Sequence, residues 1–310
     1  MRRATILRRL RDHFDTESVL EVDTPALSRA AVSDVQIESL EVKSVLSDKP
    51  LYLHTSPEFH MKRLLAAGYP DIYSIARVFR DGEAGRQHQP EFTMVEWYRR
   101  DFNLNDIIAD TLQLIAVALG KPQLEKDVAI LDYREAFLDA CQVDPFVAPL
   151  STMAKIANAD RALCDSIGEK RDDWLDLLLT MKVAPLFPND RLTVLQHYPA
   201  SQAALAQLCP NNANVADRFE VFMGATELAN GYVELRDARE LSARISIDQT
   251  ERKNRGLQQR PQDTELIAAL EFGLPACAGV AMGLERLQGV AGHSADIRDV
   301  ITFAFEVADD

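Results

Sequence analysis

Hydrophobic positions in the first hundred residues follow a helical period once and an extended period several times. The apolar residues of segment 2–14 recur at helical spacing, which predicts an amphipathic helix. Ser56 followed by Pro57 and Glu58 is typical of a second helix start, with Ser56 as the N-cap and an end near Ala67. Short apolar or alternating runs predict strands, which we expect at residues 19–22, 35–46, 51–54, 72–80 and 91–99.

Beyond residue 100 the pattern changes from strands to helices and back again. We expect an apolar helix at 104–119, ended by Gly120, and then a mainly helical insertion at about 121–185. Within the insertion the helices are expected at 133–140, 151–164 and 172–181. After it, we expect strands at 192–197, 219–222, 231–235 and 279–282, and helices at 238–255, 264–271 and 283–290. Because helices and strands do not alternate regularly, the pattern indicates a single α+β domain, with an antiparallel sheet flanked by helices.

Composition narrows the function classes. The 310 residues are 47% hydrophobic and 26% charged, which is typical of a globular chain. The 34 Lys and Arg against 48 Asp and Glu give a formal net charge of −14, so nucleic-acid backbone binding is not favoured. No apolar run approaches the roughly 18 residues of a membrane helix, and no signal peptide is visible. The four cysteines form no Cys-x-x-Cys pair, so we predict a cytoplasmic location and no disulfide framework.

The segment 77–99 carries the first set of candidate functional residues. Arg80 ends one predicted strand, His88 lies on the loop, and the next strand follows. The strand period of two places four of its side chains on one face: Phe92, Met94, Glu96 and Tyr98. Cations beside an aromatic ring suit a nucleotide, whose base stacks and whose phosphates need positive charge. The alternative is an ordinary edge hairpin with solvated loop charges.

A pair of carboxylates, Glu227 and Glu234, forms the second set. Seven residues apart on one strand, they would point in opposite directions. A bend or bulge at Asn230-Gly231 brings both to one side, where they suit Mg²⁺ or a substrate ammonium. The alternative is a hairpin with Asn230-Gly231 as its turn.

The third set lies where a small-residue strand at 279–282 enters a helix. Gly283 permits close approach of a ligand, and Arg286 in the first helical turn suits a base or a phosphate. Taken alone, this joint is more typical of tight strand-helix packing than of a ligand site.

The three sets together, in this order, resemble motifs 2 and 3 of the class II aminoacyl-tRNA synthetases, in the wording of the lysine-type catalytic domain. The key phrases are His88-x-Pro-Glu-Phe-Thr-Met-x-Glu96 and Glu227-Leu-x-Asn-Gly-x-x-Glu-Leu235. Residues 1–25 resemble motif 1, which in that family forms a dimer interface, so the resemblance implies a homodimer. It covers nearly the whole chain.

Within this class the chain is similar to the stand-alone paralogues, the elongation factor P–(R)-β-lysine ligase family. Motif 1 begins at residue 1, so we expect no anticodon-binding domain. Ser56 and Ala281 are of the ligase type, where the synthetases have alanine and glycine. The resemblance implies activation of (R)-β-lysine or lysine by ATP as an aminoacyl-adenylate. Transfer to a lysine ε-amine of elongation factor P would follow, with Mg²⁺ as cofactor.

The resemblance also implies a role for each matching residue. Arg80 and Arg286 would be catalytic, with Arg80 on the α-phosphate and carboxylate, and Glu227 would hold Mg²⁺. His88 would reach the outer phosphates, while Phe92 and Arg286 enclose adenine. The implied ATP-binding residues are Arg80, Asp81, Gly82, Glu83, His88, Gln89, Phe92, Glu227, Leu228, Gly283 and Arg286. The implied amino-acid-binding residues are Ser56, Glu58, Glu96, Tyr98, Asn230, Glu234 and Ala281.

Four residues depart from the family pattern, and one of them, Glu285 in place of an aspartate of motif 3, is a mild change. Gly82 stands where the family has a glutamate on adenine, and Glu83 would replace it if the loop shifts by one position. Gln89 replaces an asparagine of the ATP site. Arg236 follows Glu234-Leu235 where a small polar residue is usual; pointing inward, it would oppose a dicationic substrate.

Two rival functions remain. The first differs in the acceptor of the amino acid, and the second is suggested by the departures from the family pattern. One is an adenylating enzyme with another acceptor, either a tRNA or a small amine; the charge of −14 argues against tRNA. The other is a non-catalytic paralogue that binds an amino acid or a nucleotide. Gly82 favours it, whereas the presence of Arg80, Glu227, Glu234 and Arg286 argues against it.

Overall fold

The centre of the computed structural model, which describes residues 2–305, is an eight-stranded sheet. Its strands, in order across the sheet, are β1 (Leu20–Glu21), β5 (Ile72–Phe79), β6 (Glu91–Arg100), β13 (Cys277–Gly283), β12 (Thr226–Val233), β11 (Arg218–Met223), β8 (Leu192–Gln196) and β7 (Val128–Asp132). The outermost pairs, β1–β5 and β7–β8, are parallel, and the pairs between them are antiparallel. The predicted α+β fold with a mainly antiparallel sheet is confirmed.

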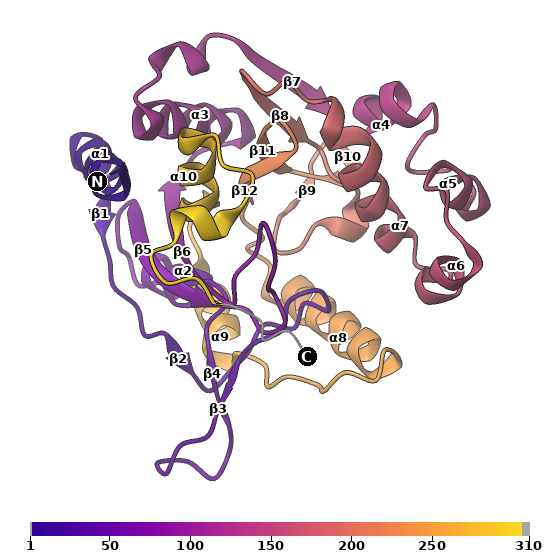
Figure 1. The fold of residues 1–310 in the computed structure, drawn as a ribbon. Helices are drawn as coiled ribbons and strands as arrows, with labels where there is room; N and C mark the ends of the chain where they lie inside the picture. Colours follow the sequence, from indigo (N-terminus) through magenta and orange to yellow (C-terminus); the bar gives the residue numbers. More distant parts are fainter. Residues whose placement is uncertain (1, 306–310) are drawn as a thin grey trace.

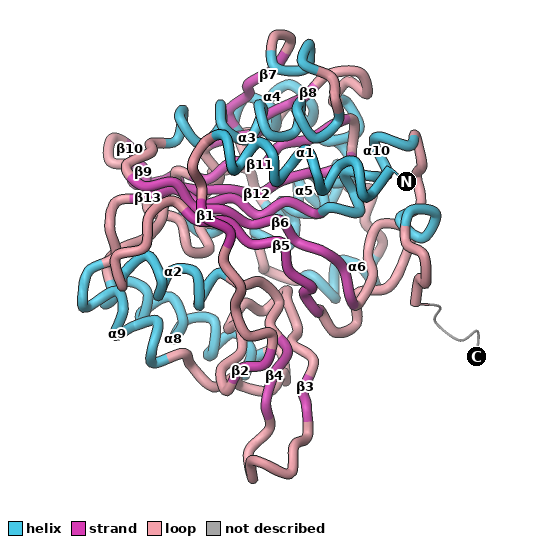
Figure 2. Tube along the Cα trace, turned by 90° about the vertical axis from the view of Figure 1, so that its left-hand side faces the viewer, coloured by secondary structure: helices cyan, strands magenta, loops and turns pink. Residues whose placement is uncertain are grey.

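Helices cover both faces of this sheet (Figures 1 and 2). One face is covered by α1 (Arg2–Thr16), α3 (Leu104–Leu119) and α10 (Leu284–Gly292). The other is covered by α2 (Glu58–Ala66), α8 (Ala238–Asn254) and α9 (Thr264–Gly273). The functional residues described below lie between the sheet and this second layer or in the cleft beside it.

The largest part of the hydrophobic core lies between the sheet and α3. Asn103 caps this helix with a capping box, and Gly120 ends it in the left-handed conformation at φ 66°. Alternate residues of β6 enter the core: Val95 and Trp97 are fully buried, and the Trp97 indole donates to Asp110 at 2.8 Å. The intervening residues of β6 therefore face the other side, as the period of two predicts.

Residues 121–187 form a helical lobe beside the sheet. Its helices are α4 (Tyr133–Cys141), α5 (Leu150–Ile156), α6 (Arg161–Ile167) and α7 (Arg171–Leu178), followed by a π-helical turn (Leu179–Val183). The lobe is joined to the main sheet through β7, which pairs with β8. The expected continuous helix 151–164 is wrong, because Asn158 takes a φ of 52° and Asp160 caps a new helix.

Shorter elements complete the chain. Two small sheets are formed by β2 (Leu27–Ser28), β4 (Leu51–Leu53) and β3 (Glu41–Val42), and by β9 (Leu208–Cys209) and β10 (Asn212–Ala216). Short 3₁₀ turns lie at Pro122–Glu125, Ala184–Leu186, Ala200–Gln202 and Ile297–Val300.

The strand expected at 35–46 is reduced to β3. Its early part follows the buried Arg252 of α8, which donates to the Asp34 carbonyl at 3.0 Å and to the Glu38 carboxylate at 2.6 Å. These bonds hold the segment in a path that leaves it outside the sheets.

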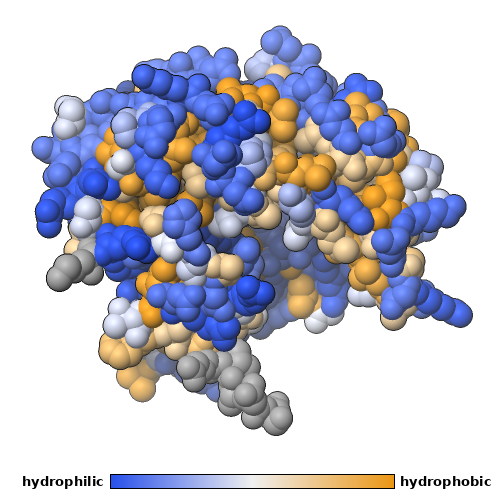
Figure 3. All heavy atoms as spheres, turned by 45° about the horizontal axis from the view of Figure 1, so that its top comes forward, coloured by the Kyte–Doolittle hydropathy of each residue, from blue (hydrophilic) through white to orange (hydrophobic). Residues whose placement is uncertain are grey.

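The surface agrees with the acidic, charge-rich composition. On the face drawn in Figure 3, hydrophilic residues dominate and hydrophobic residues gather in separate groups among them. Among residues 2–305, no helix combines the length and the apolar content that crossing a bilayer requires.

Candidate active site

Strands β6, β12 and β13 carry the predicted site on the sheet face opposite α3. Phe92 and Met94 of β6 line a cleft, and Glu96 and Tyr98 continue the same face, with the Tyr98 hydroxyl donating to Glu96 at 2.6 Å. Ala281 of β13 pairs with Glu96 and lines the same cleft. The predicted shared face of β6 is confirmed.

A β-bulge in β12 sets the direction of Glu227. Val221 of β11 pairs with Ala229, but the next residue, Phe222, pairs with Glu227, so Leu228 is an extra residue. The bulge reverses the alternation and places Glu227 on the face of Asn230, which lines the same cleft.

The predicted bend at Asn230-Gly231 is wrong, and so is the alternative of a turn there. Both residues pair regularly with β11 and β13, and the β11–β12 turn is at Gly224, which has a φ of 56°. Gly231 is needed for packing: a Cβ there would lie 2.7 Å from the Phe219 ring. The sequence correctly predicted that a bulge brings the carboxylates to one side, but placed it two to three residues too late.

The cleft next to these strands has a volume of about 290 Å³, and its lining includes three arginines, His88 and four glutamates. Arg80 lies over the Phe92 ring at 5.2 Å, and its buried Nε has no hydrogen-bond partner among the described residues. Arg286 donates to the Glu227 carboxylate at 3.1 Å and lies 3.0 Å from His88 Nε2. The cleft is lined, among the predicted residues, by Arg80, Glu83, His88, Gln89, Phe92, Glu227, Leu228, Asn230, Ala281, Gly283 and Arg286.

Two acidic side chains in the cleft are suited to a divalent metal. Burial works against ionisation of Glu227, but the Arg286 guanidinium outweighs it and lowers the pKa of this carboxyl. Glu220 of β11 also lines the cleft; burial and the nearby Glu227 raise its pKa to about 7, although Arg218 lies 2.6 Å away. A divalent cation between two such carboxylates would relieve their repulsion.

Glu220 and Arg218 were not among the predicted residues. Arg218 lies 4.5 Å over the Tyr198 ring and also donates to the Asn230 side chain at 3.2 Å. Their alternation on the strand before Glu227 is the signal in the sequence that would have found them.

The amino-acid half of the site is a buried network of three carboxylates. Ser56 donates to one oxygen of Glu96 at 2.6 Å, and Tyr98 donates to the other. Glu58 accepts from Tyr232 at 2.6 Å. Glu234 is 1% exposed and pairs with the Cys277 carbonyl through its backbone.

Lys62 occupies the middle of this network and was missed in the sequence. Its ammonium lies 2.7 Å from Glu58 and 2.5 Å from Glu234, and its side chain is 3% exposed. Burial works to lower the pKa of Lys62, but the Glu234 and Glu58 carboxylates outweigh it, so the pKa is raised and the amine is charged. Its spacing of four residues from Glu58 on a predicted helix was the available signal.

The carboxylates outnumber this single ammonium, and the pKa values of two of them are raised. Burial and the neighbouring Glu58 raise the pKa of Glu96 to about 7. Burial raises the pKa of Glu234 as well, even with Lys62 beside it. The pocket is therefore short of positive charge, and a cationic ligand would supply it.

Not all of the remaining predicted residues belong to these two groups. Asp81 and Gly82 are exposed and do not line the cleft, whereas Glu83 lines it and lies 3.7 Å from Arg80. Gln89 holds the backbone of Phe305, accepting at 2.6 Å and donating at 3.2 Å. Arg236 is exposed and so points away from the pocket.

The predicted N-cap needs a correction of one position. The helix α2 begins at Glu58 with Pro57 in the cap position, and Ser56 Oγ accepts from the Glu58 N–H at 3.0 Å while donating to Glu96. Ser56 thus links the start of α2 to the floor of the pocket.

Comparison with known proteins identifies the family to which this chain belongs. A family model described as tRNA synthetases class II (D, K and N) matches residues 1–306, so the class is that of the class II synthetase catalytic domain. Elongation factor P–(R)-β-lysine ligase of Pseudoalteromonas translucida (strain TAC 125) is 43% identical over 307 residues, which cover 97% of this chain and 93% of that protein. Proteins of the same name from Klebsiella pneumoniae (strain 342) and Yersinia pestis (strain Pestoides F) are each 41% identical over 99% of this chain and 95% of their own length. The chain belongs to the elongation factor P–(R)-β-lysine ligase family, as its sequence motifs predicted.

Proposed function

We propose that this chain activates (R)-β-lysine, or lysine, with ATP and transfers it to a lysine ε-amine of elongation factor P. The observation that carries the amino-acid half is the buried network around Lys62. Three carboxylates, Glu58, Glu96 and Glu234, surround one ammonium, so a substrate with further ammonium groups is favoured there. The relatives are named for (R)-β-lysine and elongation factor P, which fits this charge.

ATP would bind in the adjoining cleft. Arg80 would neutralise phosphate charge, His88 would contact the outer phosphates, and Phe92 and Arg286 would hold the base between them. Glu83 lines the cleft and Gly82 does not, so Glu83 would be the residue that contacts the adenine. Glu227 and Glu220 would hold Mg²⁺, which supplies charge neutralisation for the phosphates.

The reaction follows in two balanced steps. In the first, a carboxylate oxygen of the amino acid attacks the α-phosphorus of ATP, and pyrophosphate leaves. In the second, the acceptor amine attacks the acyl carbon, loses a proton, and releases AMP. The side chains contribute by holding the reacting groups in line and by stabilising the negative charge on the phosphate oxygens.

Elongation factor P as acceptor implies the compartment of translation, so we propose that the enzyme acts in the cytoplasm. The four described cysteines are all unpaired, in keeping with a reducing compartment. We also propose a homodimer through motif 1, whose Leu20 is 46% exposed; the nearby Leu27 is 45% exposed. Light scattering on the purified chain measures the oligomeric state directly.

The decisive experiment is ATP–pyrophosphate exchange with (R)-β-lysine, with α-lysine and without an amino acid. Exchange that is strongest with (R)-β-lysine supports the proposal, and incorporation of the label into elongation factor P then tests the acceptor. Exchange without transfer to elongation factor P would favour another acceptor, a tRNA or a small amine. Absence of exchange in a folded protein with Mg²⁺ would favour the non-catalytic binding paralogue.

Arg286→Ala is the matched variant for this assay. The side chain lines the cleft and bonds only to Glu227 and His88 in the described chain, so the fold is expected to survive its loss. We expect exchange to fall by about 10²–10³-fold, the usual effect of removing one donor to developing charge. Circular dichroism verifies folding, and unchanged exchange in a folded variant would remove Arg286 from the proposed ATP site.

A further inference from the structure

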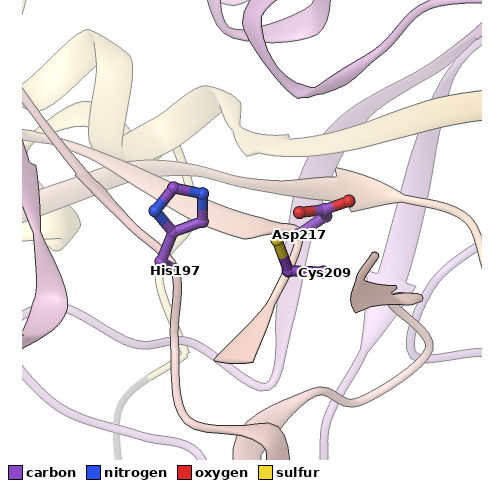
Figure 4. Close-up of side chains that lie close together, drawn as sticks. All are labelled: His197, Cys209 and Asp217. Atoms are coloured by element: carbon purple, nitrogen blue, oxygen red, sulfur yellow. The ribbon is translucent and has the colours of Figure 1, made fainter. Parts of the chain in front are cut away.

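A second group of potential metal ligands lies outside the active-site cleft (Figure 4). His197 directly follows β8, Cys209 ends β9, and Asp217 lies between β10 and β11. One ligand atom from each lies within 4.8 Å of the others. The three side chains therefore come together from three separate chain segments, and Figure 4 shows the imidazole turned toward the thiol and the carboxylate.

The orientation of His197 is fixed by a carboxylate behind it. Its Nδ1 lies 2.5 Å from Asp132 Oδ1, which leaves Nε2 as the ring nitrogen with no partner among the described residues. Metal-bound histidines usually donate their other N–H to such a carboxylate, which sets the tautomer and raises the basicity of the ligating nitrogen. Asp132 thus stands where the supporting residue of a metal site is expected.

The other two ligands are similarly available. Cys209 is half-buried and unpaired. Asp217 is 8% exposed, and its Oδ2 accepts from Gln207 at 2.9 Å, which holds the carboxylate in place. An imidazole, a thiolate and a carboxylate form a donor set that suits Zn²⁺, with a fourth position left for water.

We propose that His197, Cys209 and Asp217 bind one Zn²⁺ ion, with Asp132 as the supporting carboxylate. Binding requires that the ligand atoms, which lie within 4.8 Å of one another, shift so that each lies about 2.0–2.3 Å from a shared zinc ion. The proposal does not depend on the reaction that the active site performs.

The consequence of this ion would be local rigidity next to the active site. Tyr198 follows His197 and Arg218 follows Asp217, and the Arg218 guanidinium lies 4.5 Å over the Tyr198 ring. Arg218 also bonds to Glu220, which lines the active-site cleft. A metal that joins His197 to Asp217 would therefore fix the two segments that position Arg218, so its role is structural.

The test is zinc binding by the reduced, full-length protein, measured by competition with a chromogenic chelator. We expect one equivalent of Zn²⁺ in the wild type, and an affinity at least about 100-fold lower in Cys209→Ala and in His197→Asn. Asparagine is chosen because His197 has a φ of 58°, which Asn tolerates. Asp132→Asn should bind about 10–100-fold more weakly than the wild type.

Cys164→Ala is the matched control, since Cys164 is also half-buried and unpaired but has no place in the cluster. It should bind zinc like the wild type. Addition of zinc should raise the Tm of the wild type and of this control, but not that of Cys209→Ala. Co²⁺ should give the charge-transfer absorption of a thiolate ligand, which disappears in Cys209→Ala.

Two results would overturn the proposal. One is equal zinc affinity in the wild type, Cys209→Ala and His197→Asn, which would place the metal elsewhere. The other is the absence of zinc binding together with rapid alkylation of Cys209 that depends on His197. That result would make the group a reactive thiol with an imidazole base instead.

Discussion

Each half of the site contains one glutamate that we expect to contact a different substrate. Glu234 is buried beside Lys62 in the amino-acid pocket, whereas Glu227 bonds to Arg286 in the adjoining cleft. Both are glutamates on or next to β12, and the bulge at Leu228 puts them on the same face of the sheet, where they have different partners. The same chemical change at the two positions should therefore affect different substrates.

We expect Glu234→Gln to raise the KM for the amino acid about 10–100-fold, because it removes the charge that pairs with an ammonium. Its KM for ATP should change by less than about threefold. Glu227→Gln should show the reverse pattern, together with a higher requirement for Mg²⁺. Initial rates of ATP–pyrophosphate exchange over both substrates measure all four constants, and equal effects of Glu234→Gln on the two substrates would exclude an ammonium contact.

Lys62→Met removes the buried ammonium and so tests how much its pairing with the carboxylates stabilises the fold. Removing one partner of a buried ion pair leaves uncompensated charge and costs about 3–5 kcal/mol of stability. The loss should be largest at pH 8, where the carboxylates are ionised, and smaller at pH 5, where the raised pKa values of Glu96 and Glu234 allow them to be protonated.

Urea unfolding of Lys62→Met at both pH values measures this difference. Lys253→Met is the control, because Lys253 is exposed on α8 and its replacement should change the stability by less than about 0.5 kcal/mol. A loss for Lys62→Met that is the same at pH 5 and pH 8 would contradict the proposed coupling to the carboxylates.

At the scale of elements, β13 lies between β6 and β12 and allows their side chains to approach each other across the pocket. Its small residues keep the sheet surface low between β6 and β12, and Gly279 pairs with Tyr98 on one side and Tyr232 on the other. A Cβ at Gly279 would overlap with the Tyr98 ring and with the Glu234 carboxylate. The absence of a side chain here is what allows those two groups to approach each other.

Gly279→Ala should therefore disturb both packing and substrate binding. We expect a loss of about 1–3 kcal/mol in the free energy of unfolding, the usual cost of overpacking, and a higher KM for the amino acid. Gly283→Ala on the same strand is the control for stability, because its Cβ would lie 3.7 Å from the Arg286 side chain, an ordinary contact. Chemical denaturation compares the two variants. Equal stability would show that Tyr98 and Glu234 can shift to accommodate the added methyl group without a cost in stability.

Elements with a clear period or a distinct stop signal were predicted correctly from the sequence. The helix α3, between Asn103 and Gly120, and the alternation of β6 are examples, because local residues determine them. The bulge at Leu228 was misplaced, since its position depends on the register with β11 and not on the residues of β12 alone. Lys62 was missed because one of its two partners, Glu234, lies far along the chain, directly after β12. The role of each matching residue in catalysis stays a prediction.

At the scale of the whole molecule, the buried acids of the site make stability depend on pH. Three of them, Glu96, Glu220 and Glu234, have pKa values raised by burial. Their neutral form is favoured in the folded protein, so their contribution to stability is complete below the unfolded pKa and is lost as the pH rises through the folded value. The ligand-free protein should therefore become less stable between about pH 5 and pH 8, and a cationic substrate should restore part of the loss.

Glu96→Gln isolates one of these groups. The folded pKa of Glu96 is about 7 against 4.5 for an ordinary glutamate, which corresponds to roughly 3 kcal/mol of stability lost between pH 5 and pH 8. Glutamine has no such ionisation. Between pH 5 and pH 8 the wild type should therefore lose about that much more unfolding free energy than the variant does. Glu91→Gln, at the exposed end of the same strand, should show no such movement. Urea unfolding across the pH range measures both, and parallel curves for Glu96→Gln and the wild type would mean that Glu96 remains ionised in the folded protein.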